Sequence, residues 1–539
     1  MSSTRSVGVD FGTTTSLVSE GVVGRQPVVF PLGRTTSWLP SLVGLDADDS
    51  MRCGDAASDL PLDRVKRSVK RCITRNEVTV TLGDGTPLAA DDGIRGVLAA
   101  VALEARTGGL ALSAETTRLG CPAMWTGSQR QRLLRLAGEA GLPVTDHTLI
   151  DEPVAAGVAW VQQQQTRARD VMGKLLVVDM GGGTLDVALL DVHAEIGLDP
   201  EISVLSSWGL DEAGDALDEA VAKDLSDDLA AQGVDVADLL PGAVLQAARE
   251  AKLQLTHDLD TVVAVRDPRV SLPQVAYSRE RMEAAFAPQL RRAEGLIRDV
   301  LRGAHVTYAE QRRPSEIRKL QMEDLVADVD FVLLVGGMSR VPAVAAMVER
   351  LIPGVDLYTD VGVPADEAIV AGLGETVAYE RVNLHRPPFS FVFEYVADGV
   401  RRSVPVYDAY EPFYESWWAM QRNELYHEWR PACGALPEGG EGWLRIYTAG
   451  GEPVSLQIAG ESEPGAVKVQ LGHVPPAVTI RPDGRVGIQD GRRHHVAFRI
   501  PRWPVIRGAD YPILVLQRVE NARRPTISKP WDRDPLFMH

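Results

Sequence analysis

The stretch LLVVDMGGGTLDVALLDV, residues 175–192, decides the fold expected for this chain. An apolar run ends at Asp179, breaks at Gly-Gly-Gly-Thr and resumes around Asp186, which predicts a β-hairpin with its turn at the glycines. Glycine N–H groups can approach an anion without a Cβ in the way, so phosphate is the expected ligand of such a turn. The two flanking aspartates indicate a hard cation beside that phosphate. The alternative is a plain tight hairpin whose aspartates face water.

A second stretch near the N-terminus repeats this pattern. Residues 6–17 read SVGVDFGTTTSL, in which a short strand reaches Asp10 and then Gly12 and a run of threonines. Threonine hydroxyls and backbone amides together can hold phosphate oxygens. Because the two hairpins lie about 170 residues apart in the sequence, we expect two related half-domains that face each other across a cleft.

Three further segments carry polar residues at positions suited to a cleft. Residues 149–153, LIDEP, predict a strand that ends at an acidic pair, and Glu152 there either points into the cleft or pairs with a helix dipole. Residues 330–342 predict a buried strand that ends in a double glycine, a bare backbone on which a flat ring or a ribose can lie. Residues 64–71 are strongly basic and are expected to form an exposed helix face.

Composition narrows the classes of function. At 539 residues, with 45% apolar and 24% charged residues, the chain is expected to form two to four globular domains. Its net charge of −18 argues against a general nucleic-acid binder or a binder of anionic membranes. The four cysteines have no metal-binding or disulfide spacing, and no signal or membrane-spanning segment is recognisable. We therefore expect a cytoplasmic protein.

The character of the chain changes after residue 383. Residues 384–539 hold six of the ten tryptophans, frequent turn signals and alternating apolar runs. These features predict a β-rich module, with one helix expected over residues 416–430. The expected boundary between domains therefore lies after residue 383, with a β-rich domain over residues 384–539.

Taken together, the motifs resemble the DnaK-type 70-kDa heat-shock chaperone family within the actin-like ATPase superfamily. The resemblance rests on residues 9–16 (VDFGTTTS), 118–144, 151–156 (DEPVAA), 178–187 (VDMGGGTLDV), 335–342 (VGGMSRVP) and 366–372 (DEAIVAG). It implies an α/β fold with two lobes, in which duplicated ribonuclease H-like domains surround a nucleotide cleft. By this resemblance, residues 1–383 are expected to form an actin-like nucleotide-binding ATPase domain, and residues 384–539 a domain that binds a substrate or partner. The C-terminal β-rich domain diverges from the family, and the family's interdomain linker is not recognisable.

The resemblance also implies cofactors and roles for single residues. ATP or ADP and Mg²⁺ are the expected cofactors, with the metal held through its waters by Asp10, Asp179 and Asp186. The catalytic residues implied are Asp10, Lys66, Glu152, Asp179 and Thr184. The nucleotide contacts implied are Gly12, Thr13, Thr14, Gly181, Gly182, Gly183, Thr184, Lys252, Gly336, Gly337, Arg340 and Asp366. Around the expected adenosine site, Arg249 and Leu253 replace the family's glutamate and arginine, while Lys252 is retained.

The leading functional hypothesis is a slow Mg²⁺-dependent ATPase of the chaperone type, in which cleft closure is coupled to partner binding by the C-terminal domain. Its expected partners are ATP, an unfolded or specific client protein and cochaperones, with no nucleic acid and no membrane. The alternative is a nucleotide-sensing adaptor with little or no hydrolysis. A metabolite kinase and an actin-like filament are less favoured, because no additional aspartate base stands out and the appended domain is large.

Overall fold

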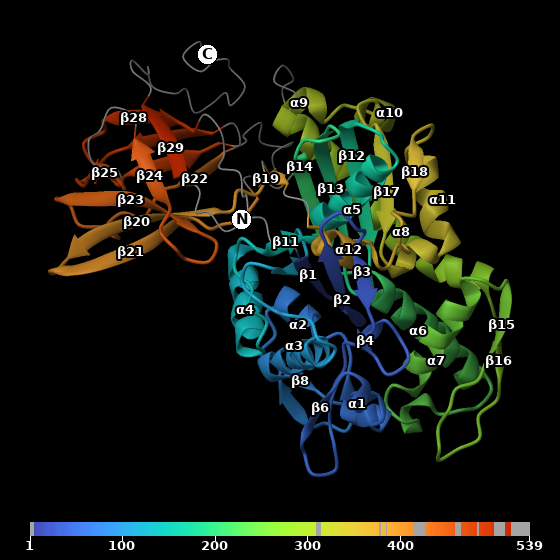
Figure 1. Ribbon diagram of the computed structural model, residues 1–539. Coiled ribbons are helices and arrows are strands. Elements are labelled where there is room, and N and C mark those ends of the chain that lie inside the picture. The colour runs from blue at the N-terminus through green and yellow to red at the C-terminus, as the bar shows by residue number, and fades with distance from the viewer. Residues whose placement is uncertain are drawn as a thin grey trace.

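The computed structural model describes residues 5–308, 314–376, 379–383, 385–412, 426–458, 465–481, 484–500 and 513–518. Figure 1 shows a large α/β part that ends at β19 (Glu380–Asn383). A strand-rich C-terminal part, from β20 (Phe389–Ala397) to β29 (Ile513–Arg518), stands beside it. Within the ranges given, no helix is both long and apolar enough to cross a membrane.

The first sheet of the α/β part is built on the hairpin of β1 and β2. Its strands are β1 (Arg5–Phe11), β2 (Thr15–Val22), β3 (Val28–Phe30), β4 (Trp38–Pro40), β10 (Thr117–Cys121) and β11 (Leu149–Asp151). β10 pairs with β1 in parallel and β11 pairs with β10 in parallel, which gives the order β11-β10-β1-β2-β3, with β4 also on β2. The first hairpin predicted from the sequence is confirmed.

The second sheet has the same plan. Its strands are β12 (Val171–Met180), β13 (Leu185–Ala194), β14 (Glu201–Leu210), β17 (Phe331–Val335), β18 (Asp356–Tyr358) and β19. β12 and β13 form an antiparallel hairpin, and β17 and β18 add in parallel beside β12, in the order β18-β17-β12-β13-β14-β19. Both sheets therefore place two parallel strands beside a hairpin, which confirms the expected pair of related halves.

Two helices join the sheets. α5 (Glu152–Thr166) contacts β12 and β13, α12 (Ala368–Gly374) contacts β1 and β2, and the helices pack on each other. A Cβ at Gly372 would overlap the carbonyl oxygen of Ala155, so the close approach of the two helices requires glycine. Because α5 is covered by neighbours on nearly all sides, its apolar residues are not confined to one face.

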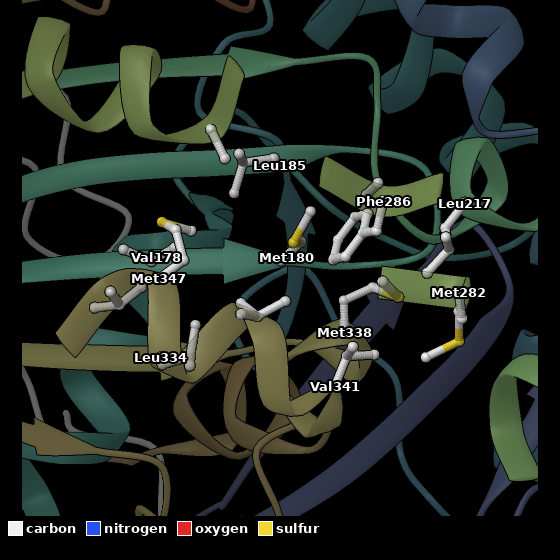
Figure 2. Close-up of a cluster of buried hydrophobic side chains, with 14 of the residues drawn as sticks. Val178, Met180, Leu185, Leu217, Met282, Phe286, Leu334, Met338, Val341 and Met347 are labelled. Carbon is white, nitrogen blue, oxygen red and sulfur yellow. The ribbon is translucent and has the colours of Figure 1, made fainter. Parts of the chain in front are cut away.

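Longer helices cover the outer faces. Their bounds are α3 (Ala90–Thr107), α4 (Gly127–Glu139), α6 (Gly214–Ala231), α7 (Ala243–Leu255), α8 (Arg279–Tyr308) and α11 (Pro342–Leu351). Figure 2 shows how Met180 of β12, Leu217 of α6, Phe286 of α8 and Met347 of α11 converge on one buried cluster. Burying side chains of this size contributes roughly 1.5–3 kcal/mol each, so this core fixes α6, α7, α8 and α11 to the second sheet. α3 and α4 pack in the core of the first sheet instead.

Short elements complete the α/β part. They are α1 (Asp55–Ser58), α2 (Arg71–Thr74), α9 (Pro314–Ile317), α10 (Met322–Val326), η1 (Leu62–Arg64), η2 (Val236–Asp238), η3 (Gly337–Arg340), β5 (Val43–Leu45), β6 (Met51–Cys53), β7 (Val65–Lys66), β8 (Thr79–Thr81), β9 (Pro87–Ala89), β15 (Asp260–Val263) and β16 (Val275–Ser278). The basic residues 64–71 thus form a turn, a short strand and the start of α2. The exposed helix face expected there is wrong.

The C-terminal part consists of two sheets that share one apolar core. Their strands, besides β20 and β29, are β21 (Val400–Tyr407), β22 (His427–Trp429), β23 (Glu441–Thr448), β24 (Ser455–Ile458), β25 (Val467–Gln470), β26 (Ala477–Ile480), β27 (Arg485–Gln489) and β28 (His495–Arg499). The sheet orders are β21-β20-β23-β25 and β22-β26-β27-β28-β29-β24. The predicted β-rich module is confirmed. Residues 416–425 of the expected helix lie outside the described residues, and His427–Trp429 is a strand instead.

Candidate functional site

Three aspartates lie at the ends of the two hairpins. Asp179 of β12 and Asp186 of β13 pair directly across the second hairpin, and Asp10 is the last residue but one of β1. Their exposed fractions are 5%, 0% and 7%. Like charges that face each other across two strands are destabilising, so this placement favours a site that a cation completes over a hairpin held together by its own contacts.

The turns of the two hairpins touch each other. A Cβ at Gly183 would lie 2.6 Å from Oγ1 of Thr13, and a Cβ at Gly182 would overlap Oγ1 of Thr14. Only glycine therefore permits this contact. The N–H of Gly181 donates to the carbonyl oxygen of Thr184 at 3.0 Å and closes the second turn. The two loops predicted from the sequence are thus brought together, with backbone amides and threonine hydroxyls from both.

Glu152 joins this group from the first sheet. β11 ends at Asp151 and α5 begins at Glu152, which is 4% exposed. Its Oε1 accepts a hydrogen bond from Nζ of Lys70 at 2.6 Å, and Lys70 is equally buried. Burial opposes the charge of Lys70, yet the carboxylates of Glu152 and Asp10 keep the pKa of this lysine above its ordinary value.

The lysine in the site is not the one expected. Lys66, the lysine expected among the catalytic residues, lies in β7 opposite Val43 of β5 and lines a separate cavity. Lys70, four residues later, occupies the place among the carboxylates. Both follow a valine and precede an arginine, so the sequence pattern alone does not distinguish them. The signal available was the apolar Cys72 and Ile73 after Lys70, which bury the start of α2.

The carboxylates outnumber their cationic partner. Burial, followed by the nearby charge of Glu152, raises the pKa of Asp10 and that of Asp186 to about 7. The same two causes raise the pKa of Asp179 well above its usual range. Among the described residues, no donor forms a well-aligned hydrogen bond with either carboxylate oxygen of Asp186 or with Oδ1 of Asp179. The side chain of Thr184 and the N–H of Met124 lie close enough to Asp186 to lower its pKa in part. Buried oxygens without well-aligned donors suit a hard cation.

The spacing of these carboxylates decides how a cation would be held. In the part of the chain that the structure describes, no three carboxylate, imidazole or thiolate groups are close enough to ligate a metal directly. A cation at this site would therefore contact Asp10, Asp179 and Asp186 through its water shell. Mg²⁺ keeps several of its waters when it is bound beside phosphates, so the residues present fit that ion.

The expected nucleoside contacts lie around the end of β17. Gly336 has φ 84°, and a Cβ there would lie 2.6 Å from Oδ1 of Asp179, so the double-glycine turn abuts the carboxylate group. Arg340 follows in η3 and forms an exposed ion pair with Asp366. These residues form one edge of the candidate nucleotide site, next to the buried carboxylates.

Helix α7 supplies a second edge of the candidate nucleotide site. Lys252 pairs with Asp218 of α6 at 2.7 Å and donates to the carbonyl oxygen of Gly214. Arg249 pairs with the same Asp218 and with Asp215. The acidic partners on α6 were not predicted. They keep the two cations of α7 fixed beside the glycine loop.

Comparison with known sequences shows which protein family this part of the chain resembles. The family described as Hsp70 protein matches residues 110–377. The chain is 29% identical over 381 residues to chaperone protein DnaK of Ureaplasma parvum and 30% identical over 377 residues to that of Thermosipho africanus. It is 29% identical over 397 residues to a chaperone protein HscA homolog of Acidithiobacillus ferrooxidans. The chain carries an Hsp70-family domain. Each match covers 68% of this chain but only 58%, 57% and 58% of the respective relative.

The predicted family is thus confirmed, and with it the fold class. The paired sheets are the two lobes of the actin-like ATPase fold, and the carboxylates and glycine loops of this Hsp70-family domain lie between them. Polar bridges join the lobes at the outer end of the cleft. Arg71 pairs with Asp211 at 2.9 Å, and Ser68 donates to Asp215 at 2.5 Å. The basic segment therefore contacts the opposite lobe.

The C-terminal domain contacts α4 of the first lobe. Arg130 of α4 pairs with Asp151 at 2.7 Å, and its guanidinium stacks 3.6 Å from the ring centroid of Tyr410. The N–H of Gly127 donates to the carbonyl oxygen of Ala409 at 2.8 Å. Asp151 immediately precedes Glu152, so one buried ion pair and one stacked ring connect the C-terminal domain to the carboxylate group.

Proposed function

We propose that this protein is an Mg²⁺-dependent ATPase of the chaperone type, in which ATP bound between the lobes controls the C-terminal domain. The observation that carries the proposal is the contact of the two glycine–threonine loops next to a surplus of buried carboxylates. Backbone amides and hydroxyls suit phosphate oxygens, whereas the unpaired carboxylates suit the cation that accompanies a triphosphate.

In this proposal the carboxylates hold the metal and the two loops hold the phosphates. Asp10, Asp179 and Asp186 would hold Mg²⁺ through its waters, and the bound ion supplies positive charge next to the phosphates. Thr13, Thr14 and the loop of residues 181–184 position the phosphate tail. Phosphoryl transfer depends mainly on such positioning and on neutralising charge.

The remaining groups would act on the attacking water and on the nucleoside. Glu152 and Asp179 orient the water, and Lys70 offsets the charge that develops on the transferred phosphoryl group. The backbone of Gly336 and Gly337 lies against the nucleoside. Lys252, Arg340 and Asp366 frame its edges.

The proposal is tested by phosphate release from ATP. We expect the purified protein to turn over ATP slowly and expect D10N and T184A to reduce that rate by about 10²-fold or more, because each removes a group that positions the metal or a phosphate. Melting curves of the variants serve as the folding control. A wild-type rate no higher than that of the variants would contradict the ATPase. If ATP and ADP then still bound tightly, the protein would be a nucleotide-sensing adaptor.

Control of the C-terminal domain is proposed to pass through Tyr410. In Y410A, Arg130 loses its stacking partner, so the link from Asp151 to the C-terminal domain is weakened. We expect the difference in amide exchange of β20 and β21 between the ATP and ADP states to shrink by at least about half. ADP affinity should stay within about twofold. The matched control is Y447A, whose tyrosine belongs to the same domain and contacts Glu394 instead; an equal loss in Y447A would contradict this route.

A further inference from the structure

A separate cavity of about 380 Å³ lies between the lobes. It is not lined by the buried carboxylates of Asp10, Glu152, Asp179 and Asp186. Residues 62–83 of the first lobe form one wall, and residues 215–249 of the second lobe form the other. Three carboxylates and five cationic side chains line it. The cations are Lys66, Arg67, Arg71, Arg75 and Arg249. A chain with a net charge of −18 therefore carries a local excess of positive charge at this place.

Three of the five cations are already neutralised. Arg71 and Arg75 both pair with Asp211. Arg249 pairs with Asp215 at 3.2 Å and with Asp218 at 2.9 Å. These pairs hold the walls of the cavity together, so they supply its frame.

The other two cations have no carboxylate in contact within the described ranges. The backbone of Lys66 belongs to the pair of β5 and β7, but its side chain takes part in no ion pair or hydrogen bond there. Arg67 donates only to the amide oxygen of Gln246, at 3.3 Å. Burial, and then the neighbouring charge of Arg249, lowers the pKa of Arg67. A half-buried cation that repels its neighbour and has only an amide partner is suited to an anionic ligand.

The cavity adjoins the second glycine loop. Asp215 lines the cavity and donates its N–H to the carbonyl oxygen of Gly182 at 2.6 Å. Gly214 donates to the carbonyl oxygen of Gly181 at 3.2 Å. A ligand in the cavity would therefore lie beside the start of α6, which is hydrogen-bonded to the second glycine loop.

We propose that this cavity binds a phosphate group, distinct from the phosphate tail held by the glycine loops, through Lys66 and Arg67. The planar fork of arginine binds phosphate with two parallel hydrogen bonds, and lysine adds a point charge. The phosphate is either free in solution or attached to the sugar of a nucleotide in the cleft. Binding of a phosphate on the sugar of a nucleotide rests on the proposed function, whereas binding of a free phosphate does not.

The test is a calorimetric titration of the full chain, first saturated with Mg-ADP. In one arm the probe is inorganic pyrophosphate. In the other, ADP that carries a 3′-phosphate is compared with ADP. We expect at least one probe to bind the wild type at least about tenfold more tightly than it binds K66Q/R67Q. The charge-keeping swap K66R/R67K should retain most of the affinity. The control R169Q/R492Q, which removes two exposed arginines elsewhere, should bind like the wild type.

The two titrations distinguish free phosphate from a phosphate on the sugar of a nucleotide. They also distinguish failure of the cavity proposal from failure of the proposed function. Pyrophosphate binding that depends on the pair supports a free phosphate, and tighter binding of the 3′-phosphorylated nucleotide supports the sugar phosphate. If ADP does not bind at all, pyrophosphate alone is used, and binding that K66Q/R67Q weakens while T184A does not still supports the cavity. Equal binding of both probes to K66Q/R67Q and to the wild type overturns the proposal.

Discussion

Replacing Lys70 by methionine is expected to lower ATP turnover by about 10²–10³-fold, since it removes the ammonium group that lies among the buried carboxylates of Asp10, Glu152, Asp179 and Asp186. The same change leaves Glu152 buried without its partner. Removing one member of a buried ion pair costs about 3–5 kcal/mol of the free energy of unfolding. Phosphate release and denaturant unfolding of K70M measure the two effects. The matched control is K223M on the exposed surface of α6, which should change neither.

A double variant separates the structural role of Lys70 from its catalytic role. K70M/E152Q removes both charges of the pair, so most of the lost stability should return. Turnover should remain at the level of K70M or lower, because the lysine and the water-orienting carboxylate are both gone. If turnover recovers together with stability, Lys70 acts only as a structural partner of Glu152, and its proposed role in phosphoryl transfer is wrong.

Replacing Asp186 by asparagine is expected to abolish most of the activity while making the nucleotide-free protein more stable. Asp186 is fully buried, and within the described part of the chain no donor forms a well-aligned hydrogen bond with either of its carboxylate oxygens. We expect a gain of about 1–2 kcal/mol in the free energy of unfolding at pH 7.5, because burying an unpaired charge is unfavourable. Turnover should fall by about 10²-fold or more, since a ligand of the metal's water shell is lost.

The pH dependence of stability follows from the same group. The ordinary aspartate pKa of 3.8 applies to the unfolded chain, while burial raises the folded pKa of Asp10 and Asp186 to about 7. Between these values the folded protein binds more protons, so its free energy of unfolding falls as pH rises from about 4 to about 7. Without nucleotide, the wild type should be more stable at pH 5.5 than at pH 7.5, and D186N should show a weaker dependence. D191N, on the same strand, is the control. A lower stability of D186N at pH 7.5 would contradict this explanation.

The local features of the site could be predicted from the sequence because they depend on short patterns. The apolar runs around the glycines determine the hairpin, and the hairpin register then places Asp179 opposite Asp186. The strand that ends before Glu152 was likewise predicted from its neighbours. The roles assigned to these residues remain proposals, whereas their positions agree with the expectation of a shared cleft.

Features that depend on contacts between distant segments could not be predicted. The choice between Lys66 and Lys70 depends on Glu152, which is 82 residues away from Lys70 in the sequence. The basic segment was expected on an exposed helix because its partners, among them Asp211, lie on the other lobe. The contact of Arg130 with Tyr410 similarly joins two domains. Periodicity and composition contain no signal for such pairs.

The central claim is that the two loops and the buried carboxylates together bind a metal-bound triphosphate. It is tested most directly by calorimetric titration of the full chain with ATP, once with Mg²⁺ and once with the metal chelated. We predict binding that is at least about tenfold tighter with Mg²⁺, because the unpaired carboxylates repel a bare triphosphate. Equal affinity with and without the metal, or no binding under either condition, would contradict the claim.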